Sequence, residues 1–378
     1  MIPAQLTGIY DEEKYRTSQE YDKAKQRMSL VSSFISLILI LLMLLLDGFA
    51  FLDNWLRAST EDPYFLALAF FGILFIASDL IGIPFSVYSV FVIEEKYGFN
   101  RTNIKTFIID KLKGYLLTAV IGGAILSLIV WFFLSAGIWF WLYAWIAMTV
   151  ITLIFTIFYT DLIVPLFNKL EPLPDGELRT AIQGYTQGVK FPLKNIFVMN
   201  GSKRSTKANA YFSGLGSKKS IVLFDTLIED HTVDELVAVL AHEVGHYKKK
   251  HVQQGMIISG IQMGIMLFVL GWLVNSPTLS AALGAEPSFH IGLLAFTLLY
   301  SPINMATGIL TNMISRKNEF EADNFALNTY NGKALMEALK KLSVKHLSNL
   351  NPHPAFVFFY YSHPPLLDRL RELSTENK

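Results

Sequence analysis

Two histidines and a glutamate stand at a spacing that suits hydrolytic metal chemistry. His242, Glu243 and His246 form the pattern His-Glu-x-x-His. Residues four apart lie on one face of an α-helix, so both imidazoles can bind one tetrahedral zinc ion at Zn–N distances of about 2.0–2.1 Å. Glu243 lies next to the first ligand and can act as general base toward a metal-bound water. The pattern therefore predicts a zinc-dependent hydrolase.

A catalytic zinc site also needs a third protein ligand and one open position. In the segment 318–323 (NEFEAD), Glu319 and Asp323 share a helix face, whereas Glu321 points elsewhere. We expect Glu319 to be the third ligand and Asp323 to orient a ligand histidine through its second ring nitrogen. Acidic residues at a helix start also occur simply because they interact favourably with the helix dipole. The histidine pattern favours the ligand interpretation.

Two further features would complete a peptidase. His363, in the sequence Ser-His-Pro-Pro, can donate a hydrogen bond to the oxyanion that forms when a peptide carbonyl is attacked. Residues 209–212 (NAYF) can form an exposed edge strand on which a substrate binds by strand addition. A single histidine before a helix is commonly structural, and short edge strands are common without a ligand. Neither feature decides between these alternatives by itself.

The other polar residues of interest have no metal-binding spacing. The chain contains no cysteine, so any metal must have nitrogen and oxygen ligands. We expect the remaining histidines on the surface or in loops: His231, His251, His290, His346 and His353. Asp79 and Asn304 lie inside apolar stretches. Such groups either line a wet cavity or hydrogen-bond between helices, and the sequence favours neither.

The elements that position these residues belong to a membrane protein. Hydrophobic residues make up 52% of the 378 residues and charged residues only 17%, against roughly 25% charged residues in soluble domains. A helix needs about 20 apolar residues to cross a bilayer. Six stretches reach that length: 29–52, 65–92, 115–135, 138–166, 253–275 and 290–314. The net charge of +1 gives no reason to expect nucleic acid as a partner.

Lysine and arginine predict the orientation of these stretches. They cluster before the first stretch, between the second and third, and between the fourth and fifth; the segment 276–289 has neither residue. Positive loops face the cytoplasm, so both termini and the polar active-site domain are expected there. The lack of cysteine and the compact length favour the bacterial inner membrane, with the endoplasmic reticulum membrane as the location for a eukaryotic protein.

The stretches divide the chain into four parts. We expect an N-terminal segment with four transmembrane helices (1–166), a cytoplasmic α+β insertion (167–252), two further transmembrane helices (253–314) and a helical tail that completes the zinc site (315–378).

Local patterns predict the elements of the polar parts. The insertion begins with a turn-rich linker at 171–176, and a helix at 177–189 and strands at 195–199 and 220–224 follow. Thr232 and Glu235 form a capping box that begins the helix with the histidine pair. In the tail, a helix runs from Asn318 to about Leu342.

The chain resembles the type I CAAX prenyl proteases, which are membrane zinc endopeptidases, nearly from end to end. The resemblance rests on an ordered series of motifs: 9–15 (IYDEEKY), 18–21 (SQEY), 95–100 (EKYGFN), 165–169 (PLFNK), 172–174 (PLP), 202–205 (SKRS), 209–212 (NAYF), 221–227 (IVLFDTL), 242–246 (HEVGH), 319–323 (EFEAD) and 361–367 (YSHPPLL). The His-Glu-x-x-His pattern alone marks a broad class, whereas this ordered set is far more specific.

The resemblance implies both a fold and a set of roles. The fold is a polytopic α-helical membrane protein, a barrel of about six transmembrane helices that encloses a water-filled chamber, with a small cytoplasmic α+β zinc-metallopeptidase domain. Family members typically have a seventh span before the segment that matches 9–15, and this sequence begins only a few residues ahead of that segment. The matching residues are the zinc ligands His242, His246 and Glu319, the base Glu243, the transition-state histidine His363, the substrate-pairing strand Asn209, Ala210 and Tyr211, and Arg369 near the site.

The leading hypothesis is a zinc metalloendopeptidase, with one Zn²⁺ per chain, that removes the C-terminal tripeptide from prenylated proteins or peptides. Its expected partners are a peptide or protein C-terminus, with or without a prenyl group, and the lipid bilayer. One alternative is a quality-control zinc peptidase of membrane proteins without prenyl specificity. Another is a non-catalytic zinc-binding transporter or scaffold, against which the open set of three ligands argues.

Overall fold

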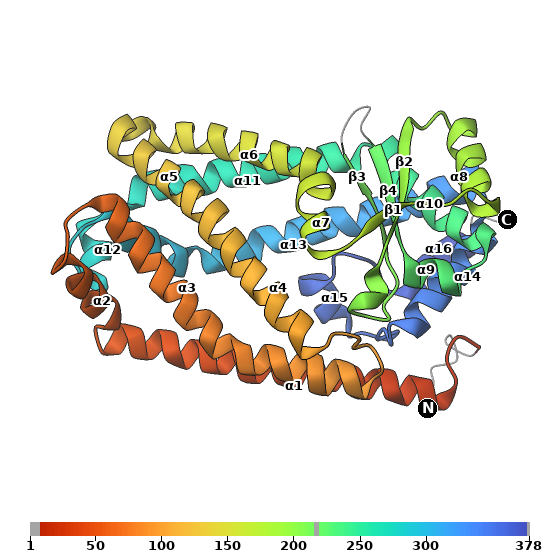
Figure 1. The fold of residues 1–378 in the computed structure, drawn as a ribbon, viewed down its shortest axis with the longest axis horizontal. Coiled ribbons are helices and arrows are strands. Elements are labelled where there is room, and N and C mark those ends of the chain that lie inside the picture. Colours follow the sequence, from red (N-terminus) through yellow and green to blue (C-terminus); the bar gives the residue numbers. More distant parts are fainter. Residues whose placement is uncertain (1–7, 215–218, 376–378) are drawn as a thin grey trace.

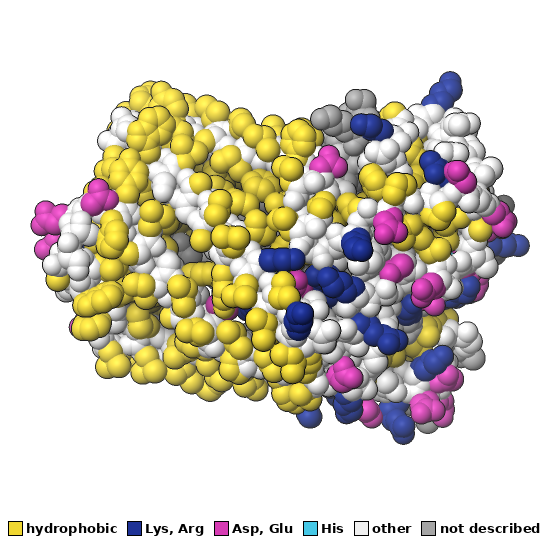
Figure 2. All heavy atoms as spheres, in the orientation of Figure 1, with side chains coloured by type: hydrophobic (Ala, Val, Ile, Leu, Met, Phe, Trp, Pro, Cys, Tyr) yellow, Lys and Arg dark blue, Asp and Glu magenta, His cyan; other side chains and the backbone are white. Residues whose placement is uncertain are grey.

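The computed structural model describes residues 8–214 and 219–375 as an elongated molecule with two different halves (Figure 1). Long helices form one half, and a small sheet with its own helices forms the other. Apolar side chains cover the helical half, whereas charged side chains gather on the sheet half and along the boundary between the two (Figure 2). This separation is expected when one half lies in a bilayer and the other in water.

Five helical segments are long and apolar enough to cross a membrane: Glu12–Leu45, Pro63–Glu94, Ile104–Phe167, His251–Leu273 and Phe289–Thr329. The third holds 64 residues and includes α5 (Gly123–Ala136) and α6 (Phe140–Leu162). The chain reverses between them at Gly137, whose φ of 54° favours glycine. This segment therefore contains two of the six predicted apolar stretches, and each of the six overlaps one of the five segments. The predicted stretch 29–52 runs past Leu45 into a separate short helix, and 253–275 runs two residues past Leu273.

The named helices of this half follow from that division. They are α1 (Glu12–Leu45), α2 (Gly48–Arg57), α3 (Pro63–Tyr88), which continues as a π-helical turn at Ser89–Glu94, α4 (Ile104–Leu117), α7 (Val164–Phe167), α11 (His251–Leu273), α12 (Pro277–Ala282) and α13 (Phe289–Thr329). Asp62 and Asn103 cap α3 and α4, because each side chain accepts a hydrogen bond from a backbone N–H of the first turn.

The membrane helices surround space rather than a solid core. The most apolar 18-residue window of each segment has between 0% and 17% of its residues buried. A helix that packs against a filled core buries a continuous apolar stripe. Here both the lipid-facing and the inward-facing sides of the helices stay open, as in a barrel that encloses a chamber.

The end of the barrel remote from the sheet is closed by packed side chains. One buried cluster joins α5, α6, α11 and α13, and a second joins α2 and α12 to α3 and α13. Within the second cluster, His290 Nε2 lies 2.6 Å from Asp53 Oδ1, and Arg57 Nε donates to Asp53 Oδ2 at 2.9 Å. The prediction that His290 lies on the surface or in a loop was wrong, because it fixes α13 to α2 through a buried polar pair.

Four strands form one sheet in the order β1-β2-β4-β3: β1 (Leu170–Pro172), β2 (Leu193–Met199), β3 (Ala210–Ser213) and β4 (Lys219–Phe224). The central pair β2 and β4 is parallel, and both edge strands are antiparallel to their neighbours. The two predicted central strands and the predicted edge strand are confirmed. The turn-rich linker begins instead as β1, because Pro172, which has no N–H, is tolerated on an edge strand.

Helices pack on this sheet to form the core of the second half. They are α8 (Glu177–Gly188), α9 (Asp225–Asp230), α10 (Val233–Lys248), α14 (Gly332–Lys345), α15 (Pro354–Tyr360) and α16 (Leu366–Thr375). The main core cluster combines strand residues such as Leu223 with Leu236 and Leu240 of α10 and Leu335 of α14. The predicted helix at 177–189 and the capping box of Thr232 and Glu235 are confirmed.

The helix α13 joins the two halves. Its 41 residues run without a break from the closed end of the barrel into the core of the sheet half. The sequence predicts a membrane stretch at 290–314 and a separate helix from Asn318 to Leu342. That separation was wrong, because nothing between 314 and 318 ends the helix; the break falls later, between Thr329 and the start of α14 at Gly332.

The helices α10 and α13 lie close together at Gly245. A Cβ atom at this position would lie 3.0 Å from both Cα and the carbonyl oxygen of Ala322, and 3.1 Å from Cβ of Phe325. These contacts are with backbone and near-backbone atoms, which cannot move aside cheaply. A side chain here would therefore force the two helices apart by a few tenths of an ångström.

We predict opposite effects of the same substitution at two helical glycines. Alanine normally stabilises a helix by about 1 kcal/mol relative to glycine, and Gly184 in α8 has open space around its Cβ position. At Gly245 the added methyl group must separate α10 from α13, which costs about 1–3 kcal/mol. Thermal unfolding in detergent should therefore show a lower Tm for Gly245→Ala and an unchanged or higher Tm for Gly184→Ala. An increase for both variants would contradict the close helix contact.

Candidate active site

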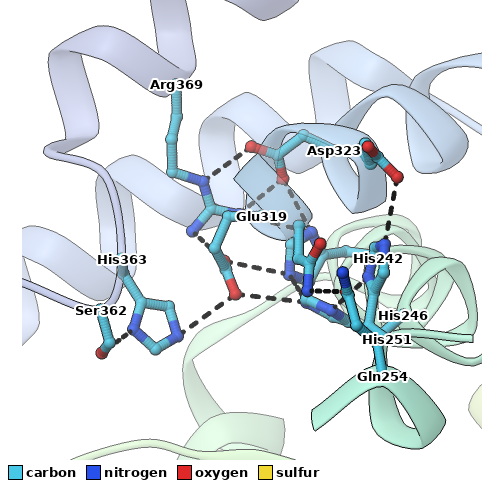
Figure 3. Close-up of polar contacts among 11 residues, drawn as sticks. His242, His246, His251, Gln254, Glu319, Asp323, Ser362, His363 and Arg369 are labelled. Atoms are coloured by element: carbon cyan, nitrogen blue, oxygen red, sulfur yellow. Dashed lines mark hydrogen bonds and ion pairs between the residues drawn. The ribbon is translucent and has the colours of Figure 1, made fainter. Parts of the chain in front are cut away.

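Two helices from distant parts of the sequence carry the predicted site residues. His242, Glu243 and His246 project from α10, and Glu319 and Asp323 project from α13. The labelled side chains of these two helices converge with His363 and Arg369 from the segment around α16 (Figure 3). The structure thus brings together residues that are up to 127 positions apart in the chain.

Three side chains face one point. The potential ligand atoms of His242, His246 and Glu319 all lie within 4.8 Å of one another. His246 Nε2 is 3.1 Å from His242 Nε2 and 3.2 Å from Glu319 Oε1, and His242 Nε2 is 3.5 Å from Glu319 Oε2. Atoms about 2.0–2.1 Å from a tetrahedral zinc ion lie roughly 3.3 Å apart, so these separations match those of metal ligands.

The carboxylate of Glu319 supports the same conclusion. Its Oε2 atom is buried and finds no hydrogen-bond partner within the described ranges 8–214 and 219–375. A buried carboxylate oxygen without a donor is costly, and a bound cation removes that cost. Two imidazoles and one carboxylate therefore fit a divalent metal ion.

A second layer holds the first histidine in place. Asp323 Oδ1 lies 2.7 Å from His242 Nδ1, and Arg369 donates to both carboxylate oxygens of Asp323, from Nε at 2.7 Å and from Nη2 at 2.5 Å. Burial alone would lower the pKa of His242, but the hydrogen bonds to Asp323 and Glu319 raise it to about 9. A proton on Nδ1 turns the lone pair of Nε2 toward the metal position. Arg369 is itself buried, and its other Nη atom lies 3.5 Å from Glu319 Oε2.

The second histidine is held by a residue that the sequence does not reveal. His246 Nδ1 lies 3.0 Å from Nδ1 of His251, whose Nε2 lies 3.2 Å from Glu321 Oε2. His251 was predicted to be a surface or loop residue, but it is buried at the start of α11. The chain turns at Lys250, which has a φ of 62°, so the two histidines meet without any helical spacing. Glu321 points away from the metal position, as expected.

Glu243 lies where two cavities meet. One cavity of about 740 Å³ lies between β3, α6, α11 and α13, and another of about 540 Å³ lies between β3, α10, α14 and the segment of His363. Glu243 and His246 line both cavities. Burial raises the pKa of Glu243, and the neighbouring imidazoles oppose this rise. A carboxylate with a raised pKa beside a metal position is suited to accept and return a proton.

His363 lies beside Glu319, the expected third ligand of the metal. Its Nε2 atom is 3.4 Å from Glu319 Oε1, and its Nδ1 atom is 3.0 Å from the hydroxyl of Ser362. The side chain is 65% exposed, so its ring is open to the 540 Å³ cavity, which it lines. It is therefore within reach of a group bound at the metal.

The edge strand β3 runs past the metal position. It pairs with β4 on one side, with Ala210 opposite Leu223, and lies at the end of the four-stranded sheet. Asn209 and Ala210 line the 540 Å³ cavity, whereas Tyr211 lines the 740 Å³ cavity. An extended peptide added to this edge would cross from one cavity to the other beside Glu243.

Of the remaining histidines, His346 lines the 540 Å³ cavity, and among the described residues none of them belongs to the group of potential metal ligands. His231 is buried, contrary to the prediction, with Nδ1 3.0 Å from the carbonyl oxygen of Leu227. His346 is partly buried and its Nε2 accepts a hydrogen bond from the backbone N–H of Ala208 at 3.0 Å. His353 caps α15, as a loop residue can. The contact of His346 joins residues 138 positions apart, so no spacing rule could have found it.

A barrel of membrane helices, an α+β domain and an open three-ligand metal centre beside a glutamate define a membrane-embedded metallopeptidase. The family model described as CAAX prenyl protease N-terminal, five membrane helices, matches residues 1–169, and the model described as peptidase family M48 matches residues 172–377. The chain belongs to peptidase family M48.

Known proteins of this family are similar over almost the whole chain. The chain is 36% identical to the CAAX prenyl protease 1 homolog of Arabidopsis thaliana, with 100% of this chain and 91% of that protein covered. It is 33% identical to CAAX prenyl protease 1 of Saccharomyces cerevisiae, with 98% and 88% covered. The crystal structure of S. mikatae Ste24p superposes with a TM-score of 0.93 at 34% identity, with 99% of this chain and 91% of that chain covered.

These similarities confirm the resemblance, the fold class and the enzymatic activity predicted from the sequence. The chain is a multi-pass membrane metalloendopeptidase that acts on a peptide or protein substrate, and it is not a non-catalytic transporter or scaffold. The relatives named here are plant and fungal proteins. They give no support to the predicted bacterial inner membrane.

We predict that Glu319 and Glu321 differ in their effect on metal content. Glu319→Ala removes one of three ligands and should lose nearly all bound metal, whereas Glu321→Ala should keep about one metal ion per chain, because a catalytic site depends on three protein ligands. Elemental analysis of both purified variants, beside the unchanged protein, measures this directly. Metal loss in Glu321→Ala with retention in Glu319→Ala would place the third ligand elsewhere.

Proposed function

We propose that this enzyme uses one Zn²⁺, held by His242, His246 and Glu319, to cut the peptide bond that follows a prenylated cysteine and so release the C-terminal tripeptide. The observation that carries this proposal is the 740 Å³ cavity, which extends from Glu243 and His246 to the membrane helices. The names of the relatives, CAAX prenyl protease 1 and its homologs, support the same substrate class.

The lining of that cavity suits a substrate with one polar end and one apolar end. Beside Glu243 it is bounded by the edge strand, and farther away by Tyr159 of α6, Ile258 of α11 and Ile314 of α13. A peptide can bind along the strand by main-chain hydrogen bonds, while an apolar chain on the same residue is removed from water by the membrane helices. A soluble peptidase has no need for this combination.

The reaction follows from the positions of the side chains. When Zn²⁺ is bound by the three ligands, it polarises the substrate carbonyl and brings the pKa of a water molecule near neutrality. Glu243 takes the proton of the attacking water and then gives it to the departing amine. His363, open to the cavity at 3.4 Å from Glu319, donates a hydrogen bond to the developing oxyanion. Asp323 and Arg369 keep His242 oriented throughout.

The edge strand positions the scissile bond. Asn209, Ala210 and Tyr211 lie at the junction of the two cavities and hold the substrate backbone extended beside Glu243. The distribution of lysine and arginine supports a cytoplasmic position for this domain. A membrane protease that removes misfolded proteins would share the zinc chemistry but would have no preference for a prenyl chain.

We predict that a farnesylated peptide ending in a CAAX sequence is cleaved in preference to its unprenylated twin, and that the cut follows the modified cysteine. The apolar half of the cavity gives the reason, because burial of a farnesyl chain stabilises the complex by about 0.8 kcal/mol per CH₂ group. Mass spectrometry of the products measures both site and rate.

The control is the Glu243→Gln variant, which should keep its metal and lose hydrolysis by about 10²–10⁴-fold because the proton acceptor is gone. Equal cleavage of both peptides at scattered sites would contradict prenyl specificity and indicate a general membrane peptidase. Undiminished hydrolysis by Glu243→Gln would instead refute the assigned base.

A further inference from the structure

We infer that the C-terminal carboxylate of the substrate is held at Lys25 and Lys207. The inference rests on the proposed function, in which the substrate pairs with the edge strand β3, and adds the chemical group that ends the substrate. Its basis is the hydrogen bonding of the strand edge, the two cavities on either side of Glu243, and a pair of cations in a third cavity that adjoins one of them.

The antiparallel register of β3 with β4 continues before the strand begins. The carbonyl oxygen of Asn209 accepts from the N–H of Phe224 at 3.0 Å, and that of Lys207 accepts from Oγ1 of Thr226 at 3.0 Å. Residues 207 and 209 therefore turn their backbone groups toward β4. In a strand the backbone groups of alternate residues point to opposite sides, so those of residues 208, 210 and 212 point to the free edge.

His346 ends this free edge at Ala208. The backbone N–H of Ala208 donates to His346 Nε2 at 3.0 Å. The next outward N–H, that of Ala210, donates to the exposed side chain of Asn209, whose Oδ1 lies 2.8 Å away. That side chain can rotate aside for a substrate. A substrate can therefore form strand hydrogen bonds beside Phe212 and Ala210, whereas at Ala208 its backbone has to leave the strand edge, because His346 already takes the N–H there.

The two cavities then set the direction of the substrate. Tyr211 and Phe212 line the cavity that reaches the membrane helices, and Asn209 and Ala210 line the one that ends near His346. In an antiparallel arrangement, residues before the scissile bond lie beside Phe212 and those after it lie beside Asn209. The prenylated cysteine then enters the apolar cavity and the tripeptide the polar one. The parallel arrangement would place the prenyl chain against His346.

A cavity of about 450 Å³ adjoins the polar one and contains two lysines. The two cavities share His346, His363 and Arg369 in their walls. Lys25 Nζ and Lys207 Nζ lie 5.2 Å and 5.3 Å from the ring centre of Tyr21, so both cations flank one ring. An extended tripeptide reaches about 10 Å past the scissile bond, at about 3.3 Å per residue. Lys207 lies three residues before Ala210 in the chain, so the backbone advances by as many residues from Ala210 to Lys207 as the tripeptide contains.

The balance of charge at this end favours an added carboxylate. Lys207 Nζ already pairs with Glu94 Oε2 at 2.7 Å and donates to the hydroxyl of Tyr21 at 2.8 Å. Lys25, which is exposed on α1, has no ion pair among the residues that the structure describes. Asp22, in the same cavity, is engaged by the side-chain amides of Gln26 at 2.9 Å and Asn349 at 3.0 Å. A substrate carboxylate would thus complete the pairing of Lys25 and take the remaining N–H of Lys207.

The experiment compares kcat/KM for a farnesylated peptide with a free C-terminal carboxylate and for the same peptide with a C-terminal amide. The unchanged enzyme should prefer the acid by roughly 10- to 100-fold, as expected for hydrogen bonds to a charged group. In Lys25→Met the acid-to-amide ratio should fall toward one, mainly through KM of the acid, and in Lys25→Glu it should fall further. Lys23→Met, a change at an exposed lysine of the same helix, should keep the ratio of the unchanged enzyme.

Equal cleavage of acid and amide by the unchanged enzyme would overturn this inference while leaving the proposed function intact. So would an equal loss for both peptides in Lys25→Met, since that loss would be structural. Failure of the unchanged enzyme to cleave either farnesylated peptide would count against the proposed function instead.

Discussion

The whole metal centre depends on one close contact between two helices. α10 brings two histidines from the small domain, and α13 brings a glutamate from the far end of a membrane helix. Gly245 allows this approach, because even a methyl group at this position would lie only 3.0–3.1 Å from Ala322 and Phe325 and would push the helices apart. The three ligand atoms then lie at separations that a single metal ion requires. The distance between α10 and α13 therefore determines whether the three ligand atoms can bind one metal ion.

The same contact explains why the site lies at the boundary of the two halves. Because α13 is continuous, the membrane barrel and the sheet half share one rigid element, and the cavity beside Glu243 opens toward both. The open inner faces of the membrane helices would be costly in a soluble protein, which has to bury its apolar side chains. For the prenylated substrate that we propose, these faces would provide the space that holds its apolar part.

Much of the site could be predicted from the sequence because its residues obey helical spacing. The pairs His242 with His246 and Glu319 with Asp323 are each four apart, and the capping box fixes where α10 begins. His251 and His346 could not be found in this way. His251 reaches His246 across a turn at Lys250, and His346 bonds a backbone N–H that is 138 positions away. Contacts of this kind depend on tertiary packing, which leaves no periodic pattern in a sequence.

The most direct test of the central claim is X-ray absorption at the zinc edge of the purified protein in detergent. The account predicts four nitrogen or oxygen neighbours at about 2.0–2.1 Å, two of them imidazoles, as expected for two histidines, one carboxylate and a water molecule in the open position. A spectrum with three imidazoles would contradict it, because His251 or His363 would then replace Glu319 and the contact between α10 and α13 would no longer define the metal centre.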